Sequence, residues 1–392
     1  MLPLAGITVV AVEQAVAAPF ATRHLADLGA RVIKIERPGV GDFARRYDTT
    51  VKGMSSHFVW LNRAKESLTL DLKHPEAPPI LRALLAGADV FVHNLAPGAM
   101  DRLGFGSAAL HPDYPRLIVS EISGYGSSGP YREKKAYDLL IQCETGLVSV
   151  TGTPENPAKA GISVADIAAG MYAYSGILTA LYRRERTGAG ATFEVSLFEA
   201  LGEWMGYPMY YAAYGGGAPP RTGARHATIA PYGPFATQDG QEVFLGVQNE
   251  REWERFCRIV LEDPDLAGDP RFAANADRAT HRQALDAAIG AVLGELTGEQ
   301  AIERLERAGI ATARLNAPQD FWDHPQLAAR ERRRQVDSPA GPLRALLPPV
   351  TMPGDEPRMG KIPALGEHTE AILHELGYDQ TRIESLRAAG AI

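Results

Sequence analysis

The sequence GITVVAVEQAVAAPFATRHLADLGARVIKIERPGVGD, at residues 6–42, determines the fold class that we predict. Residues 6–12 are mostly apolar, which is typical of a buried strand. A helix is expected over residues 19–28, because proline suits its first turn and Gly29 ends the pattern. Residues 31–35 then form a second strand. Two strands joined by a helix within about thirty residues form a βαβ unit, which implies parallel strands and a right-handed crossover.

The same alternation of strands and helices continues through the first half of the chain. A helix is expected over residues 75–88, and strands are expected over 89–93 and 116–122. A longer helix is expected over 167–184, and residues 192–206 pass from a short strand into another helix. The first half is therefore predicted to be a Rossmann-like α/β domain with a parallel sheet.

The second half of the chain has a different pattern. Residues 211–225 are rich in Gly, Pro and Tyr, which is typical of a linker or loop. Residues 232–247 then resemble a strand pair that turns at Asp239-Gly240. Further helices are expected at 250–260, 280–294 and 298–308, a strand at 310–316 and a proline-rich return at 339–352. We predict a large α/β domain over 1–210, a smaller α+β domain with linkers over 211–330, and a C-terminal segment over 331–392.

Composition is that of an ordinary soluble protein. The 392 residues suggest two or three domains, and 45% are hydrophobic while 22% are charged. The net charge of −7 argues against non-specific nucleic-acid binding. No apolar run reaches about 18 residues, so no membrane span is expected, and no basic leader is visible, so we expect a cytoplasmic protein. Cys143, Cys257 and the histidines lack the spacing of metal ligands. We therefore predict no metal and no tightly bound cofactor.

One acidic residue, Asp166, is the strongest candidate for catalysis. It lies in GISVADIAAGMY, at residues 161–172, where a polar break precedes a long helical pattern. The ordinary interpretation is a helix N-cap, whose carboxylate accepts N–H groups of the first turn. However, small neighbours such as Ala165 and Ala168 leave room for a bulky ligand. The helix terminus also keeps the carboxylate ionised, so Asp166 can be both a cap and a nucleophile.

A glycine-rich motif, GYGSSG at residues 124–129, matches the G-x-G-x-x-G pattern of dinucleotide-binding proteins. That fold requires a helix to begin at the motif. Pro130 and the charged run at 132–135 do not suit such a helix, so binding of NAD or FAD is not expected. We interpret the motif as a turn beside an acyl chain.

Several sequence blocks, taken in order, resemble the class III CoA-transferase family. This family includes formyl-CoA transferase, carnitine CoA-transferase, dicarboxylate CoA-transferases and the α-methylacyl-CoA racemases. The similarity extends through nearly all of the chain. The blocks are LAGITVV at 4–10, ARVIKIERPGVGD at 30–42, NRAKESLTLDLK at 62–73, NLAPGAMDRLG at 94–104, GYGSSGPY at 124–131, the segment around Asp166 and LGEHT at 365–369.

The resemblance implies that Asp166 is the covalent nucleophile and that the substrates are an acyl-CoA and a small carboxylic acid. It also implies that residues 331–392 return to the large domain, and that two ring-shaped chains interlock as a homodimer. CoA carries phosphates at one end and a long uncharged arm, so its site needs cations and an uncharged channel. Arg37 follows the second strand, where nucleotides bind in such sheets. The CoA contacts implied by the resemblance are Val16, Arg37, Leu72, Lys73, Asn94, Leu95, Ala96, Arg102, Lys135 and Tyr137.

The expected chemistry transfers CoA through an aspartyl-CoA thioester on Asp166, which needs N–H donors to developing oxyanions. The loop of His226, Ala227 and Thr228 matches the family's mobile glycine-rich loop in position, although the glycines here lie earlier, at 215–217. A second carboxylate on the acceptor needs a further cation. The candidates are Arg45, Arg221 and Arg225, with Tyr137 and His226 as added donors. They favour a C4–C5 dicarboxylic acid, with succinyl-CoA as a candidate donor.

Two other functions remain open at this stage. A racemase of the same family needs two opposed bases and uses a His–Asp pair with a Glu from the small domain. Here Tyr137 precedes Asp138 at the position of the pair, and Asn249 occupies the Glu position; an unperturbed Tyr is a poor base near neutral pH. The chain could also bind CoA without catalysis. We expect Lys34 and Lys65 to be surface or secondary charges. His368 is expected to make a capping or inter-segment contact.

Overall fold

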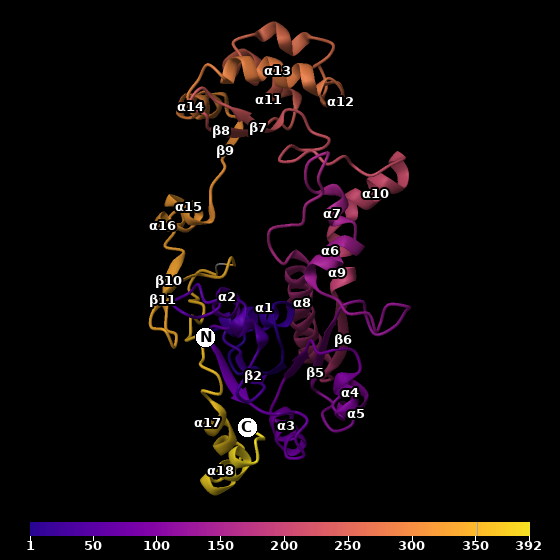
Figure 1. The fold of residues 1–392 in the computed structure, drawn as a ribbon, viewed down its shortest axis with the longest axis vertical. Coiled ribbons are helices and arrows are strands. Elements are labelled where there is room, and N and C mark those ends of the chain that lie inside the picture. The colour runs from indigo at the N-terminus through magenta and orange to yellow at the C-terminus, as the bar shows by residue number, and fades with distance from the viewer. Residues whose placement is uncertain (351) are drawn as a thin grey trace. The chain divides into compact units, whose positions relative to one another are not determined.

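The computed structural model describes residues 1–350 and 352–392 and divides the chain into two compact units (Figure 1). The large unit contains residues 1–146, 160–207 and 327–392. The small unit contains residues 147–159 and 208–326. The chain therefore leaves the large unit and later returns to it. Sequence patterns give no sign that the segment 147–159 belongs with the small unit.

A six-stranded parallel sheet forms the centre of the large unit, in the order β3-β2-β1-β4-β5-β6. Val10 of β1 pairs with Ile33 of β2 on one side and with Phe91 of β4 on the other. The chain builds β1 to β3 in one direction and then places β4 beside β1, so the strand order reverses between β1 and β4. The strands are β1 (Thr8–Val12), β2 (Arg31–Glu36), β3 (Lys65–Thr69), β4 (Val90–His93), β5 (Ile118–Ser123) and β6 (Ala191–Ser196).

The predicted α/β class with a parallel sheet is confirmed. Strands β1 and β2 fall at the predicted positions, and both are almost completely buried, as expected for strands covered on both faces. The intervening helix α1 (Ala17–Asp27) begins two residues before the predicted start at Pro19 and is buried along its whole length. Helix α3 (Ala77–Ala86) also lies inside its predicted range, and its apolar face joins the core beneath β2, β3 and β4.

Helix α8 (Val164–Thr187) packs along α1 and contacts β5 and β6. The two helices approach closely because Gly170 has no side chain: a Cβ there would lie 2.7 Å from the carbonyl oxygen of Ala17. By length and composition alone α8 could cross a membrane, contrary to the expectation from apolar runs. Its buried residues Ala165, Ala168 and Ala173 face the interior of the large unit, which is the behaviour of a core helix.

The remaining helices of the large unit are short connectors. Phe43–Arg46 forms one 3₁₀ turn after β2. The others are α2 (Ser56–Leu61), α4 (Ala99–Arg102), α5 (Ser107–Leu110), α6 (Asp138–Glu144) and α9 (Leu197–Trp204). Helices α10 (Gly206–Gly215) and α16 (Pro325–Ala329) each contain one of the four boundaries between the two units.

The returning segment covers the outer edge of β3. The Ser67 N–H donates to Nδ1 of His368 (3.2 Å), and the Thr69 N–H donates to the hydroxyl of Thr369 (2.9 Å). Farther along, the Asp71 N–H donates to the carbonyl of Ala391 (2.8 Å). His368 therefore makes an inter-segment contact, as predicted. This segment contains the antiparallel pair β10 (Arg333–Val336) and β11 (Leu343–Leu346) and the helices α17 (Thr369–Glu375) and α18 (Gln380–Ala388).

The small unit is an antiparallel three-stranded sheet with helices. Its first two strands turn at Asp239-Gly240, as predicted, because the Asp239 carboxylate accepts a bond from the Thr237 hydroxyl and Gly240 adopts φ +75°. Trp253, Phe256 and Phe272 form the centre of its core. Its elements are α7 (Leu147–Val150), β7 (Tyr232–Ala236), β8 (Glu242–Gly246), α11 (Glu250–Arg255) with a π-helical continuation (Phe256–Val260), a 3₁₀ turn (Pro264–Gly268), α12 (Asn275–Thr280), α13 (Arg282–Leu293), α14 (Gly298–Ala308), β9 (Ala311–Arg314) and α15 (Pro318–Trp322).

Candidate active site

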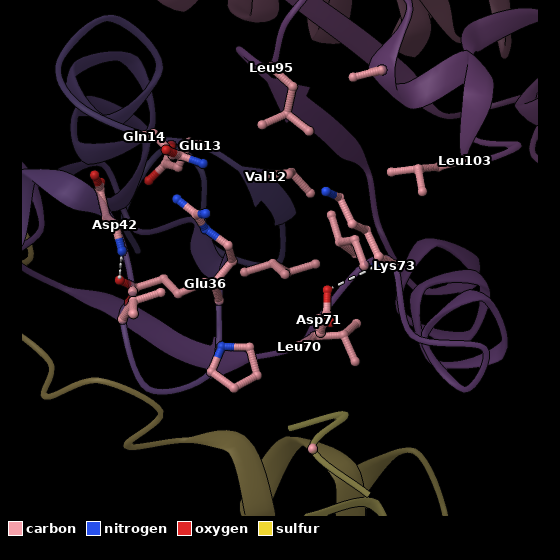
Figure 2. Close-up of a pocket in the computed structure, with 18 of the residues that line it drawn as sticks. Val12, Glu13, Gln14, Glu36, Asp42, Leu70, Asp71, Lys73, Leu95 and Leu103 are labelled. Atoms are coloured by element: carbon pink, nitrogen blue, oxygen red, sulfur yellow. Dashed lines mark hydrogen bonds between the residues drawn. The ribbon is translucent and has the colours of Figure 1, made fainter.

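A cavity of about 880 Å³ lies at the carboxyl edge of the large sheet (Figure 2). Its walls come from the ends of β1, β2 and β3 and from the segment that follows β4, so it lies beside the reversal of strand order. Open α/β sheets bind their ligands at this position. Cations, carboxylates and apolar side chains line it together. The cations are Arg37, Lys73 and Arg102, the acidic residues are Glu13, Glu36, Asp42 and Asp71, and the apolar residues include Val12, Ile35, Leu70, Leu72, Leu95 and Leu103.

The cavity brings together many of the residues predicted to contact CoA, namely Arg37, Leu72, Lys73, Leu95 and Arg102. Within residues 1–350 and 352–392, the side chains of Arg37 and Lys73 have no hydrogen-bond or ion-pair partner. The Arg102 guanidinium makes one long bond, from Nη1 to the carbonyl of Pro97 (3.4 Å). Three exposed cations with unused donors can hold phosphate groups, while the apolar wall suits an uncharged arm.

The other predicted CoA contacts lie outside this lining. Asn94 has a structural role, since its amide donates to the carbonyl of Gln14 (2.8 Å) and its Oδ1 accepts from the Gln14 N–H (2.9 Å). Val16 packs in a small apolar cluster with Phe20 and Leu61. Ala96 lines a second, smaller cavity, and Lys135 and Tyr137 are exposed on the segment before α6.

Beneath the cavity lies a buried network of charges that the sequence analysis misjudged. Lys34 and Lys65, expected at the surface, are both buried. Lys34 donates to Asp42 (2.8 Å) and lies 3.4 Å from Glu13, while Lys65 donates to Glu13 (2.7 Å). Each strand that carries one of these lysines is covered on both faces, so the long side chains reach inward to carboxylates. Opposite charges compensate one another here, which is the condition for burying them.

The network shifts the pKa values of its members in opposite directions. Burial would raise the pKa of Glu13, but Lys65 and Lys34 hold it below its usual range. Burial would lower the pKa of Lys34, but Asp42 and Glu13 hold it above its usual range. For Lys65, burial prevails over the attraction of Glu13 and lowers the pKa to about 8. The Glu13 carboxylate therefore remains ionised at neutral pH.

Asp42 connects this network to the backbone around the cavity. Its Oδ1 accepts the N–H groups of Ala15 (3.1 Å) and Ala44 (2.9 Å), and its Oδ2 accepts from Lys34. Ala15 has φ +61°, a conformation that non-glycine residues rarely adopt without support. Asp42 supplies that support, and it thereby fixes the turn between β1 and α1 that borders the cavity.

Asp166 lies in the first turn of α8 and not at its N-cap, which is Ser163. The N-cap interpretation is therefore wrong. Its carboxylate has no hydrogen-bond or ion-pair partner in the part of the chain that the structure describes. Buried Ala165, Ala168 and Ala169 surround the half-buried side chain with small groups, as expected. The Asp166 carboxylate is consequently surrounded by small groups and has its oxygen atoms available to a ligand.

The protonation of Asp166 also differs from expectation. Burial, followed by the negative charge of Asp138, raises the pKa of Asp166 to about 7, so the helix terminus alone does not keep it ionised. Asp138, at the start of α6, accepts the Ala165 N–H (2.8 Å) and the amide of Gln142 (2.7 Å). The carboxylates of Asp138 and Asp166 thus lie close together. Asp166, which accepts no hydrogen bond from the described residues, has the raised pKa.

Tyr47 is a further candidate for the site that the sequence did not predict. Burial, together with the charges of Asp42 and Asp166 and the nearby Tyr137, raises its pKa to about 12. The phenol is therefore close to both the cavity-lining Asp42 and the candidate nucleophile, and it stays protonated as a potential donor. The available sequence signal was its position directly after the matched block 30–42 and the basic pair at 45–46.

The arginines predicted to hold a second substrate carboxylate already have partners. Arg45 forms a bidentate pair with Glu36 (2.8 and 2.7 Å) and lies over the ring of Phe58. In the small unit, the Arg221 guanidinium donates to the carbonyls of Ser149, Thr153 and Pro154. Both side chains thus stabilise the fold. The three bonds of Arg221 also hold segment 147–159 in the small unit.

Arg225 and the loop after it form a separate arrangement in the small unit. Arg225 lies 3.3 Å from Asp286 and over the ring of Phe235, and its Nη1 has no hydrogen bond within the described residues. His226 stacks on Tyr232, and its Nδ1 accepts the N–H groups of Thr228 (3.2 Å) and Ile229 (3.0 Å). The N–H groups of this loop are therefore partly used inside the loop.

Comparisons with known proteins identify the family to which the chain belongs. The profile of CoA-transferase family III matches residues 4–369. Among similar proteins, acetyl-CoA:oxalate CoA-transferase of Acetobacter aceti is 37% identical over 84% of each chain. Succinyl-CoA:glutarate CoA-transferase of Mus musculus is 32% identical over 100% of this chain and 91% of its own.

Solved structures agree with these relatives. A CAIB/BAIF family protein from Brucella suis has a TM-score of 0.83 and 32% identity, over 96% of this chain and 99% of its own. A hypothetical protein from Mycobacterium tuberculosis has a TM-score of 0.82 and 26% identity, over 95% and 99% of the two chains. The fold and the relatives define an enzyme of the CoA-transferase class. The chain belongs to CoA-transferase family III.

Proposed function

We propose that this enzyme transfers CoA from an acyl-CoA to a small dicarboxylic acid through an aspartyl-CoA thioester on Asp166. The observation that carries the proposal is the state of the Asp166 carboxylate, which is half-buried, surrounded by small residues and free of donors. A carboxylate held by several donors would be a weak nucleophile, whereas this one has its lone pairs available.

The reaction has a donor half and an acceptor half, and each half consists of two acyl-transfer steps. A carboxylate oxygen of Asp166 attacks the donor thioester carbonyl, the C–S bond breaks, and a mixed anhydride and CoA thiolate result. The thiolate sulfur then attacks the Asp166 carbonyl carbon, the anhydride C–O bond breaks, and the donor acid leaves as its carboxylate. The acceptor carboxylate repeats both steps in reverse. No water enters the sequence, so the free energy of the thioester is conserved.

The large cavity supplies the proposed CoA site. Arg37, Lys73 and Arg102 have donors for the phosphate groups, and Leu70, Leu72 and Leu95 offer an apolar wall to the uncharged arm. Tyr47, whose pKa responds to both Asp42 and Asp166, marks the proposed path from the cavity towards the nucleophile. As a protonated phenol it is a candidate donor to an oxyanion.

The names of the relatives support the proposed substrate class, a dicarboxylic acid. The position of a cation that would bind its second carboxylate supports it less. Relatives are named for the transfer of CoA to oxalate, glutarate and D-citramalate, all of them dicarboxylic acids, and several use succinyl-CoA. Arg45 and Arg221 are fully engaged, which leaves Arg225 as the predicted arginine with unused hydrogen-bonding capacity. We therefore propose Arg225 as the partner of the second carboxylate, with His226, Ala227 and Thr228 beside it.

A racemase remains less suited to this site. The position of its histidine is held by Tyr137, whose side chain is 66% exposed, and the position of its glutamate is held by Asn249. The Asn249 side chain accepts the Glu252 N–H and donates to the Glu252 carboxylate, so it caps α11. An amide has no basic group, and a phenol is in general a poorer general base than an imidazole.

Trapping the intermediate tests the proposal directly. The enzyme is mixed with succinyl-CoA, quenched with hydroxylamine and digested, and the peptides are analysed by mass spectrometry. A hydroxamate is expected on Asp166, only when acyl-CoA is present. Modification of another carboxylate, or none at all while CoA exchange proceeds, would overturn the aspartyl-CoA mechanism. A panel of oxalate, malate, citramalate and glutarate as acceptors then identifies the acid.

Two further expectations concern the whole protein. The interlocked homodimer implied by the resemblance remains a prediction, which light scattering after gel filtration can test. Exposed aromatic side chains on α9 and α10, such as Trp204, Tyr210 and Tyr214, are compatible with burial in a partner. A cytoplasmic location also remains a prediction.

A further inference from the structure

A second cavity, of about 210 Å³, lies in the large unit at the carboxyl ends of β4 and β5. The glycine-rich turn at 124–129, which dinucleotide chemistry does not explain, contributes Gly126 and Ser127 to its wall. Residues 95–103 contribute to both cavities: Leu95 lines both, Ala99 and Arg102 line the large one, and Met100 lines the small one. A ligand in the small cavity would therefore contact the segment that borders the CoA site.

His93 gives this cavity its most specific feature. Its side chain is the last of β4 and lines the cavity, although the residue is only 8% exposed. Neither ring nitrogen has a hydrogen-bond partner within the described residues, and the nearest carboxylate oxygen, from Glu121 on β5, is 3.7 Å from Nε2. A buried polar group left unpaired is costly, so such groups usually belong to a binding site or a network.

The charge of the cavity selects cations. Carboxylates of Asp101, Glu121, Glu133 and Glu194 line it, and Arg132 is the basic side chain among them. Arg132 lies 3.3 Å from Glu133, which neutralises that pair. Glu194 accepts the Ser127 N–H (2.9 Å). Carboxyl groups thus outnumber basic side chains in the lining of this cavity.

The geometry favours an organic cation over a metal ion. Within residues 1–350 and 352–392, no three His, Cys, Asp or Glu side chains converge as metal ligands. Apolar side chains form much of the remaining wall, including Leu95, Met100 and Ile122. A volume of about 210 Å³ has room for a small organic ion. Those dimensions match an ammonium group on a short alkyl chain.

We propose that this cavity binds a small protonated primary amine, whose ammonium group donates to His93 and Glu121 and whose alkyl chain contacts Met100 and Ile122. Because residues 95–103 border both cavities, occupancy of the small cavity changes the affinity of the large one for CoA. The binding claim is independent of the proposed reaction, whereas the coupling to CoA rests on the proposed CoA site. By linkage, CoA must change the affinity for the amine by the same factor.

Isothermal titration calorimetry of the full chain with n-butylammonium tests the binding claim. We expect saturable binding of one ion per chain and no binding of n-butanol, which has the same shape without the charge. Glu121→Gln, which keeps the shape of the side chain, should weaken binding at least tenfold, while the matched exposed control Glu185→Gln should leave it unchanged. Circular dichroism of both variants checks the fold, and His93→Gln provides a second variant that retains a polar group.

Clear outcomes would overturn the proposal. Equal binding of butanol and butylammonium, equal affinity in wild type and in a folded Glu121→Gln variant, or the absence of saturable binding would reject an amine site. Displacement of butylammonium by millimolar K⁺ or Mg²⁺ would assign the cavity to a metal ion instead. The coupling is measured by titrating CoA with and without saturating butylammonium. An identical CoA affinity in both titrations would reject the coupling alone, and loss of CoA binding in both would instead reject the proposed CoA site.

Discussion

Two acidic residues in the large unit, the buried Glu13 and the half-buried Asp166, have opposite properties. Glu13 is enclosed by Lys34, Lys65 and the hydroxyl of Thr22, and its pKa lies below the usual range. Asp166 has no such donor in the described structure, and its pKa is raised to about 7. The comparison teaches that burial alone does not mark a reactive carboxylate. A paired one supports the fold, and an unpaired one is available for chemistry.

The strongest test of this contrast removes the unpaired carboxylate. Asp166→Ala should lower the rate of CoA transfer by at least about 10³-fold, because loss of a covalent nucleophile removes the reaction path itself. Its free energy of unfolding should stay within about 1 kcal/mol of wild type, since the side chain has no partner to lose. Steady-state CoA exchange and urea denaturation measure the two effects. Glu299→Ala, at an acidic first-turn position of α14, is the control and should retain full activity.

Removing the paired carboxylate should affect stability instead. Glu13→Gln leaves the buried Lys65 without a counter-charge and Lys34 with Asp42 alone, so we expect a loss of about 3–5 kcal/mol in the free energy of unfolding. The control is Glu66→Gln, which breaks the more exposed pair between Glu66 and Arg31 and should cost at most about 1 kcal/mol. Urea unfolding of both variants provides the measurement. Similar losses in the two variants would contradict the structural role assigned to the buried network.

The pH dependence of the reaction separates the two groups further. Since the pKa of Asp166 is raised, its nucleophilic ionised form is lost as pH falls through about 7. The value of kcat/KM should therefore fall about tenfold for each pH unit below that point. Asp138→Asn keeps an oxygen for the Ala165 N–H and removes the neighbouring charge, so the acid limb should move to lower pH. An acid limb that does not move would show that Asp138 does not set the pKa of Asp166.

The smallest expected effect concerns the cations of the large cavity. Arg37→Gln and Arg102→Gln should each raise the KM for acyl-CoA by about tenfold and change kcat little, because ground and transition states hold the phosphates alike. Arg82→Gln, which breaks an exposed pair with Asp113, is the control. Kinetics with dephospho-CoA thioesters identify the residue that contacts the 3′-phosphate. A fall in kcat at constant KM would remove both arginines from the CoA site.

The sequence was most informative where a pattern is local. The apolar runs at 6–12 and 31–35 predicted two neighbouring parallel strands, and the small residues around Asp166 predicted an uncrowded carboxylate. The burial of Lys34 and Lys65 was missed, because a lysine between apolar residues does not show whether a carboxylate faces it. The partners of Arg45 and Arg221 were missed for the same reason. Glu36 is near Arg45 in sequence, but the carbonyls that hold Arg221 come from about 70 residues away.

The segment that covers β3 has a consequence for the synthesis of the protein. The N–H group of Ser67 donates to His368, which lies 301 positions later in the chain and is synthesised correspondingly later. At about 5–20 residues per second, the ribosome needs roughly 15–60 s to produce it. During that interval β3 is an edge strand with exposed hydrogen-bonding groups, which is a template for aggregation. The yield of soluble enzyme should therefore depend on chaperones that protect nascent chains, even though the finished molecule covers this edge.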